Sequence, residues 1–410
     1  MKYRLLDLMS CPECNKPFAI SVFSKKEREY PKEDNKNRLK KCETYCAFSH
    51  CKLEMNQSEN IDCNSCQKIE IEEGILICNA CKKWFPIIGF IPRIIPKTIE
   101  EHPDFFKKYK ERLPEELINK NQLEAFLKLK KKTMSSFGFQ WTHYKDIIKD
   151  VERFVFLRKT GIEPSFLKGK LVLDVGCGYG RYSYAALEFG GKEVIGIDLS
   201  RAVESAYENT INYPNVHIIQ ADIFHLPFRE QIFDVIFSLG VLHHTPSTKE
   251  AFMKLIPFLK KMGTIIIWVY RRRQPIRMVL NHIIRLITLK IPHPILWRLS
   301  WIAKPLGGLV LMLSGTKYIP TVYKGQKVSM EVSKFPKIYR ILARLFFFVS
   351  VKPNGNERWG DTFDWWSPHY EHFHTQEEVI GWFKEVGLQD ITITSRQDVK
   401  DDIGVKGIKK

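Results

Sequence analysis

Three aspartates follow short apolar segments at a constant interval of 24 residues: Asp174, Asp198 and Asp222. Between the first two lies a loop, residues 176–180, with glycine at every second position. Glycine has no Cβ, so the loop can turn sharply and let a ligand lie against its backbone. The second aspartate, about 20 residues past the glycines, is placed to accept both hydroxyls of a ribose. The spacing predicts a nucleoside-binding site.

The three aspartates can form one site only if the strands that precede them end at the same edge of a sheet. Apolar segments at 193–199, 216–222 and 233–239 follow the first strand, with helical stretches between them. This alternation predicts a doubly wound parallel α/β sheet, whose ligand lies across the carboxyl ends of the strands. A fifth strand is expected at 263–270. A helix at 376–386 and strands at 388–394 and 403–408 would complete the sheet.

The motifs LDVGCGYGRYS, GIDLS, ADIFHLPF and FDVIFSLGVLHHTP stand in order along residues 173–246. They resemble the class I S-adenosylmethionine-dependent methyltransferases, in particular the type 11 group that includes ubiquinone and menaquinone C-methyltransferases. The resemblance implies a Rossmann-like seven-stranded sheet that binds S-adenosylmethionine. A dinucleotide dehydrogenase is the rival interpretation, but its G-x-G-x-x-G pattern fits this loop less well.

The resemblance also assigns cofactor contacts. The assigned residues are Asp174, Gly176, Cys177, Gly178 and Gly180 for the methionine end, Asp198 and Leu199 for the ribose and adenine, Asp222 and Ile223 for the adenine amine, and Leu239 beneath the sulfonium. A loop-capping role for Asp174 and a helix-capping role for Asp222 are the structural alternatives.

His243 and His244 follow the fourth strand, where type 11 enzymes place groups that face the acceptor. Histidine changes charge near neutral pH, so either is a candidate catalytic base. On an extended segment adjacent side chains point in opposite directions, so only one is expected to face the acceptor. Packing or cofactor contact is the alternative, because methyl displacement needs mainly in-line positioning.

Two C-x-x-C pairs near the start of the chain indicate a metal site. Cys11 and Cys14, with Cys78 and Cys81, provide four thiolates in the pattern of a tetrahedral structural zinc. The flanking sequences resemble the small zinc-ribbon activator subunit that partners tRNA and protein methyltransferases in eukaryotes, here fused to its enzyme. The intervening segment departs from that pattern. Whether this segment holds a second zinc ion is left undecided. Its cysteines are Cys42, Cys46, Cys51, Cys63 and Cys66.

Length and composition are those of an intracellular protein with several domains. The 410 residues suffice for two or three domains. No secretory leader pattern is evident in residues 1–21, so we expect a cytoplasmic protein with reduced or metal-bound cysteines. The predicted domains are a zinc ribbon (1–98), a helical linker and cofactor gate (99–165), the cofactor-binding core (166–270), a basic apolar helical insert (271–356) and the end of the core (357–410).

The linker and the final segment contain further candidates. A helix is expected at 115–133, and the aromatic segment 136–144 would cover the cofactor through Phe139, Gln140 and Trp141. A hydrophobic clasp on the sheet is the alternative. Near the end of the chain, candidates for the acceptor wall are Asp361, Asp364, Trp365, His369, Tyr370 and His374, with plain aromatic packing as the alternative.

The insert carries most of the net charge of +18, with 16 basic side chains and one acidic side chain in residues 271–356. Ile276, Val279, Leu280, Ile283, Ile284 and Ile287 form the apolar stripe of a helix. No stretch reaches the roughly 20 apolar residues of a membrane span. A lid packed on the core is favoured, with a membrane-surface element or an RNA platform as alternatives.

Together these patterns predict a methyltransferase that acts on oxygen, nitrogen or carbon of a small-molecule or lipid-like acceptor. The insert would admit that acceptor or touch a membrane peripherally. The first alternative is an RNA methyltransferase in which the ribbon and the insert hold the RNA. The second is a non-catalytic scaffold with a methyltransferase fold. No protein partner is inferred.

Overall fold

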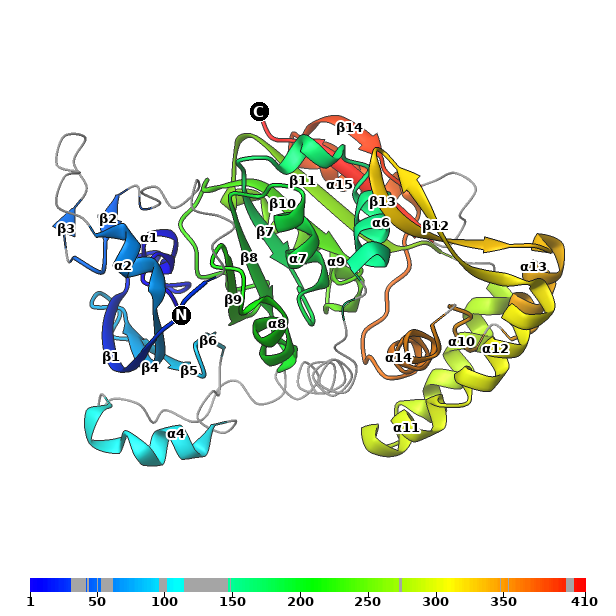
Figure 1. Ribbon diagram of the computed structural model, residues 1–410, viewed down its shortest axis with the longest axis horizontal. Helices are drawn as coiled ribbons and strands as arrows, with labels where there is room; N and C mark the ends of the chain where they lie inside the picture. Colours follow the sequence, from blue (N-terminus) through cyan, green and yellow to red (C-terminus); the bar gives the residue numbers. More distant parts are fainter. Residues whose placement is uncertain are drawn as a thin grey trace.

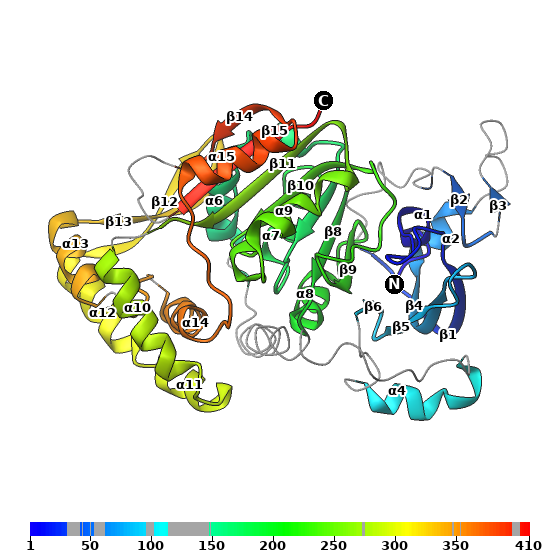
Figure 2. The same ribbon diagram turned by 180° about the vertical axis from the view of Figure 1, so that it is seen from behind.

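A computed structural model provides the structure. It describes residues 1–30, 42, 44–49, 51–52, 62–95, 102–113, 147, 149–272, 275–346, 348–352, 354–395 and 402–410. Among these, one large mixed sheet contains eleven strands in the order β1-β4-β5-β6-β9-β8-β7-β10-β11-β15-β14. The zinc ribbon lies at one end of the molecule, and an arm built from the insert lies at the other (Figures 1 and 2).

The central strands form the predicted doubly wound sheet. They are β7 (Leu171–Val175), β8 (Glu193–Asp198), β9 (Val216–Ala221), β10 (Phe233–Leu239) and β11 (Leu259–Tyr270). Neighbouring strands pair in parallel in the order β9-β8-β7-β10-β11. Their nearly continuous Val, Ile and Leu residues are buried on both faces, as parallel strands covered by helices require.

Helices α6 (Lys149–Thr160), α7 (Arg181–Glu188) and α8 (Ala202–Thr210) pack on this sheet, with a 3₁₀ turn at η4 (Pro164–Leu167). From β7 the chain continues on one side to β8 and β9, and on the other side to β10. The carboxyl ends of these four neighbouring strands lie at the same edge of the sheet. Between β10 and β11 lie α9 (Thr248–Met253) and η6 (Ile256–Phe258), and the last elements of the chain are α15 (Gln376–Glu385), β14 (Gln389–Ile393) and β15 (Asp402–Ile408). Strand β15 is antiparallel to β11 and to β14, as expected.

The zinc ribbon continues this sheet. It comprises α1 (Leu5–Leu8), β1 (Ala19–Glu27), β2 (Tyr45–Cys46), β3 (Cys51–Lys52), α2 (Cys63–Lys68), β4 (Ile69–Ile77), β5 (Trp84–Ile88) and β6 (Ile91–Ile94), followed by α4 (Pro103–Lys108) and η3 (Lys110–Arg112). Strand β6 pairs in parallel with β9, joining Arg93 to Gln220 and Ile94 to Ala221. The side chain of Arg93 also donates to Gln220 at 2.9 Å. The boundary predicted near residue 98 therefore separates two parts of a single sheet.

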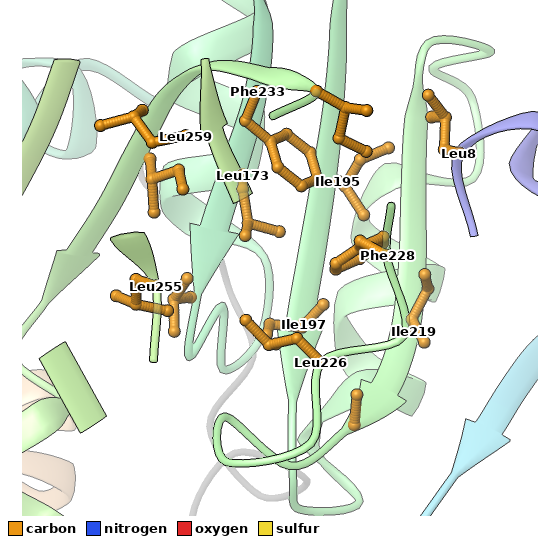
Figure 3. Close-up of a cluster of buried hydrophobic side chains, with 14 of the residues drawn as sticks. Leu8, Leu173, Ile195, Ile197, Ile219, Leu226, Phe228, Phe233, Leu255 and Leu259 are labelled. Atoms are coloured by element: carbon orange, nitrogen blue, oxygen red, sulfur yellow. The ribbon is translucent and has the colours of Figure 1, made fainter. Parts of the chain in front are cut away.

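A shared core and a buried ionic group strengthen this junction. Leu8 of α1 belongs to the same buried cluster as Ile195 of β8 and Phe228 of the loop between β9 and β10 (Figure 3). Arg4, 5% exposed, donates to Glu193 of β8 at 3.1 Å and pairs with Asp7. The ribbon and the core therefore form one packed body.

The insert forms an arm, residues 275–346, that stands beside the core (Figure 1). Its helices are α10 (Pro275–Thr288), α11 (His293–Ser300), α12 (Ala303–Ser314) and α13 (Pro336–Leu345). The prediction of an all-helical insert is wrong in part, because β12 (Thr316–Tyr323) and β13 (Gln326–Ser333) form an antiparallel hairpin. Lys324 and Gly325 have φ of 48° and 74°, the left-handed conformation that a tight hairpin turn requires.

Helix α14 (Gly355–Trp366) supports the arm and contacts α10, α11 and α12. Trp297 of α11 stacks on Trp359 and packs against the buried Phe363. The apolar helical stretch His293–Ser314 is long enough to cross a membrane by length and composition alone, and core helices of other proteins pass the same test. The stretch includes Arg298 and Lys304, and 39% of its most apolar window is buried in the protein, so the absence of a membrane span stays a prediction.

Candidate functional site

The glycine loop between β7 and α7 has the conformation that its sequence predicts. Gly176, Gly178 and Gly180 have φ of 80°, 53° and 87°, which side chains with a Cβ rarely adopt. A Cβ at Gly176 would collide with Val241, and one at Gly180 would lie 3.2 Å from the backbone of Ala206. The loop backbone therefore passes close to its neighbours, and substitution there is strained.

Asp198, at the end of β8, links this loop to the next one. Its carboxylate accepts from the backbone N–H of Gly178 at 3.0 Å, from that of Ser200 at 2.8 Å and from the hydroxyl of Ser200 at 2.7 Å. A carboxylate has about four acceptor positions, so capacity remains for a ribose hydroxyl. Burial raises the pKa of Asp198, and the hydrogen bonds from Ser200 and Gly178 oppose that shift.

Asp174 and Asp222 both make local hydrogen bonds, but Asp222 does not cap a helix as its structural alternative required, because a turn follows β9. Asp174 is 1% exposed and accepts from the Ser183 hydroxyl at 2.7 Å. Burial raises its pKa to about 7, against the lowering effect of that hydrogen bond. Asp222 accepts from the N–H of Phe224 at 3.0 Å and so shapes the loop after β9. These roles are compatible with the predicted cofactor contacts.

The predicted cofactor residues all lie at the carboxyl ends of β7, β8, β9 and β10 or in the loops that follow them. Leu199 follows β8, and its carbonyl accepts from Gln220 at 3.1 Å. Ile223 follows β9 and packs against the main core, whereas Leu239 is the last residue of β10. Cys177 is 3% exposed and belongs to the core on the other face of the sheet. The fold brings the whole predicted set to one edge.

His243 and His244 lie in a 3₁₀ turn, η5 (Leu242–His244), and not in an extended segment. Their rings lie side by side with centroids 4.2 Å apart, so the expectation of opposite directions was wrong. Nδ1 of His244 lies 2.9 Å from the carbonyl oxygen of Tyr370. His243 is fully buried, and neither of its ring nitrogens has a hydrogen-bond partner among the described residues.

The pKa values of both histidines are lowered. Burial is the main cause for each, and the neighbouring imidazole His244 adds to the effect on His243. The pKa of His243 lies well below 6.5, and that of His244 falls to about 3. Both imidazoles are therefore neutral at physiological pH, and His243 is the one with unsatisfied ring nitrogens.

Further charged groups lie near these strand ends: Lys159 and Arg181, which were not among the predicted site residues, and Asp364, which was a predicted residue of the acceptor wall. Lys159 of α6 lies 3.8 Å from the ring centroid of Trp268, and burial together with Arg181 lowers its pKa to about 7. Burial raises the pKa of Asp364 in α14 to about 8, and Asp361 and Glu371 add to that shift. Arg181 directly follows the glycine loop, which was the available sequence signal; nothing in the local pattern marks Lys159.

Aromatic rings line the end of β11 beside these groups. Tyr270 lies 3.9 Å from the ring of His243, 6.1 Å from Trp268 and 5.9 Å from Phe373, on which it stacks. His372 donates its backbone N–H to the carbonyl of His243 at 2.9 Å. The segment after α14 is thus held against the end of the sheet. Flat rings with adjacent cations suit a planar acceptor.

The four cysteines of the ribbon come together as predicted. The sulfurs of Cys11, Cys14, Cys78 and Cys81 all lie within 4.8 Å of one another. Each pair stands on an equivalent turn, with Cys11 donating its N–H to Lys16 and Cys78 to Lys83, both at 2.8 Å. Four thiolates without an open position fit a structural zinc.

The remaining cysteines of the ribbon do not form a comparable group among the described residues. Cys46 and Cys51 face each other across the β2–β3 pair, and Cys63 and Cys66 lie in α2. A second zinc site stays a prediction. The expected helix at 115–133 and the gate residues Phe139, Gln140 and Trp141 lie outside the described residues.

Comparison with protein families agrees with both predicted parts. Residues 2–89 match the Trm112p-like protein family, and residues 167–285 match a methyltransferase domain family. The chain carries a methyltransferase domain joined to a Trm112p-like domain. The resemblances to a methyltransferase and to its zinc-ribbon activator are confirmed, and the two predicted ligands, S-adenosylmethionine and zinc, accord with these domains.

The sequence relatives of the methyltransferase domain overturn the predicted acceptor. The chain is 33% identical over 125 residues to the tRNA U34 carboxymethyltransferase of Nautilia profundicola, covering 30% of the chain and 42% of the relative. It is 28% identical over 197 residues to that of Pseudoalteromonas atlantica, covering 45% and 57%. The chain thus spans about half the length of these relatives. Their name denotes an RNA acceptor, so the prediction of a small-molecule or lipid-like acceptor is wrong and its RNA alternative is favoured.

Solved structures are similar only in part. The 1,6-didemethyltoxoflavin-N1-methyltransferase of Burkholderia thailandensis has a TM-score of 0.38 and 14% identity, covering 72% of this chain and 94% of its own. An S-adenosylmethionine-dependent methyltransferase from Listeria monocytogenes has a TM-score of 0.34 and 16% identity, covering 63% and 98%.

Proposed function

We propose that the protein transfers a methyl group from S-adenosylmethionine to a base of an RNA, with tRNA as the first substrate to test. The observation that carries the proposal is the sequence similarity of the methyltransferase domain to enzymes named for tRNA. An RNA acceptor also agrees with the predicted cytoplasmic location.

The residues at the strand ends fit the cofactor. The glycine loop has the sharp left-handed turns against which the methionine end is expected to lie, Asp198 has acceptor capacity for the ribose, and Asp222 stands at the start of the loop expected beside the adenine. When bound, the sulfonium supplies an activated methyl group, whose carbon–sulfur bond breaks as the acceptor atom bonds to the carbon. The chain must then orient the acceptor in line and exclude water.

The acceptor side supports a nucleobase. Tyr270, Phe373 and Trp268 offer ring faces on which a base can stack, and Arg181 provides positive charge for the RNA backbone. A base must leave its helix or loop to reach such a site. We assign His243 as the group that accepts the proton or orients the acceptor atom, because His244 is already engaged by Tyr370.

The test is transfer of labelled methyl from S-adenosylmethionine to bulk tRNA, followed by nucleoside analysis. Label in a tRNA nucleoside should disappear with Asp198→Ala and persist with Asp150→Ala, whose exposed carboxylate pairs with Arg153 on the same helix. His243→Ala should lower turnover about 100-fold with little change in cofactor affinity. Label that enters protein or lipid and not RNA would contradict the proposal.

A further inference from the structure

The arm exposes most of the large apolar side chains found on the surface. Of the 21 exposed large hydrophobic residues in the described parts of the chain, 18 lie between Val279 and Leu345. Single apolar residues are common on protein surfaces, but a concentration of this size marks a site of interaction with another surface.

Helix α10 turns its polar side toward the protein. Asn281 donates to Glu371 at 2.8 Å, and Arg285 donates to the carbonyl of Trp365 at 3.0 Å. The Thr288 hydroxyl donates to the carbonyl of Trp366 at 2.8 Å. These residues at i, i+4 and i+7 form one face of the helix, and that face is held by α14 and the segment after it.

The apolar stripe of α10 consequently points outward. Ile283 is 49% exposed and Ile287 is 62% exposed, although both belong to the stripe that the sequence predicted to pack on the core. A helix held by its polar side, with its apolar side facing solvent, has the opposite arrangement to a surface helix of a globular domain. The favoured lid interpretation does not account for this orientation.

Helix α13 also turns an apolar stripe toward solvent, and a separate basic stripe runs beside it. Ile341 and Leu345 are 58% and 64% exposed, and Ile338 lies one turn before them. Lys337, Arg340 and Arg344 are each one position before an apolar residue and are also exposed. Long basic side chains beside an apolar stripe can reach lipid headgroups while the stripe enters the boundary between headgroups and acyl chains.

Charge selects among the partners of this surface. Residues 271–356 carry 16 basic side chains and one acidic side chain. A second copy of the arm would bring two strongly positive surfaces together, which is electrostatically unfavourable. RNA would satisfy the charge but offers no counterpart to the exposed Ile and Leu side chains. An anionic bilayer complements both properties.

We propose that the outer face of the arm docks on the surface of an anionic lipid bilayer. The helices of the arm lie in the interface between lipid headgroups and acyl chains. They lie there because Trp297, Phe363 and the other residues packed between α11 and α14 hold the inner side of His293–Ser314 against the protein. The site at the strand ends stays outside the bilayer. This inference is independent of the acceptor assigned above, because it depends only on the arm.

The test is flotation of the full-length protein with vesicles. Vesicles of phosphatidylcholine mixed with phosphatidylglycerol should carry the protein upward, and vesicles of phosphatidylcholine alone should do so much less. The double variant Ile341→Ser/Leu345→Ser should lower the vesicle affinity about tenfold or more. Each of Lys337→Gln, Arg340→Gln and Arg344→Gln should lower it about fivefold, and added salt should lower it further.

Met262→Ser is the matched control, because Met262 is 74% exposed but lies on β11 outside the arm. Its vesicle affinity should stay within about twofold of that of the parent protein. Failure to float, or equal loss in the control, would overturn the proposal. Two further results would overturn the proposal. One is a dimer of the parent protein that the double variant no longer forms. The other is tRNA binding that the double variant loses, together with no binding to vesicles. Methyl transfer to tRNA is also measured with the double variant. This measurement distinguishes failure of the membrane-docking proposal from failure of the proposed RNA acceptor.

Discussion

The ribbon and the arm, at opposite ends of the molecule, use apolar helices in opposite ways (Figure 1). In the ribbon, Leu5 and Leu8 of α1 are 1% and 2% exposed and join the core of the methyltransferase domain. In the arm, polar residues of α10 such as Arg285 contact the body, and Ile283 and Ile287 face outward. Periodicity shows which residues share a face of a helix. It does not show which face meets the rest of the protein.

The largest expected effect comes from breaking the ribbon at its metal. Cys78→Ser, or removal of zinc by a chelator, should destabilise the whole protein by about 5 kcal/mol or more, because metal binding and folding of such a site are coupled. Since the ribbon and the core share one sheet, thermal unfolding should show a single transition at a lower temperature. Lys25→Ala, at an exposed position of β1, should change the stability by less than about 1 kcal/mol. Two separate transitions would contradict a shared core.

The next effect is expected at the buried ionic group between ribbon and core. Arg4→Met removes the guanidinium that pairs with the buried carboxylates of Glu193 and Asp7, at a cost of about 3–5 kcal/mol, although Glu193 keeps its contact with His217. Denaturant unfolding measures this loss, and the double variant Arg4→Met/Glu193→Met should recover part of it. Lys26→Ala breaks an exposed pair with Glu72 and should cost about 1 kcal/mol or less.

In the arm, the corresponding polar anchor should act locally. Arg285→Ala removes the hydrogen bond to Trp365 and the ion pair with Glu371, with an expected local cost of about 1.5–3 kcal/mol. Hydrogen exchange should accelerate in α10 and α14 and remain unchanged in the ribbon. Arg298→Ala, at an exposed position of α11, is the control. Equal acceleration in β4 or β6 would show that the two regions are coupled.

The smallest effect is a pH dependence of the helix that supports the arm. The raised pKa of Asp364, about 8, means that the neutral carboxyl stabilises the folded state fully below pH about 4. That contribution is lost as the pH rises toward about 8, so exchange of α14 should accelerate over this window. Asp364→Asn should remove the acceleration while the ribbon is unaffected. An identical pH profile in the variant would exclude Asp364 as its origin.

Much of the predicted site follows from local chemistry. The alternating glycines at 176–180, the three aspartates and the four zinc ligands each depend on residue type and short spacing. The parallel strands then bring the aspartates together because strand ends meet at one edge. Lys159 could not be found in this way, since long-range packing of α6 brings it to that edge, whereas Asp364 was already a candidate and only its burial required the tertiary structure.

The sequence by itself determined the methyltransferase sheet, its glycine loop and the cysteine turns, because backbone conformational preference and hydrophobic alternation act over a few residues. Only the tertiary structure decided that β6 continues the main sheet, that His243 and His244 lie side by side, and that α10 turns its apolar stripe outward. Each of these depends on hydrogen bonds and burial between segments far apart in the chain, such as Arg285 with Trp365. A local sequence pattern carries no information about which distant surface will bury its apolar side chains or bond its polar ones.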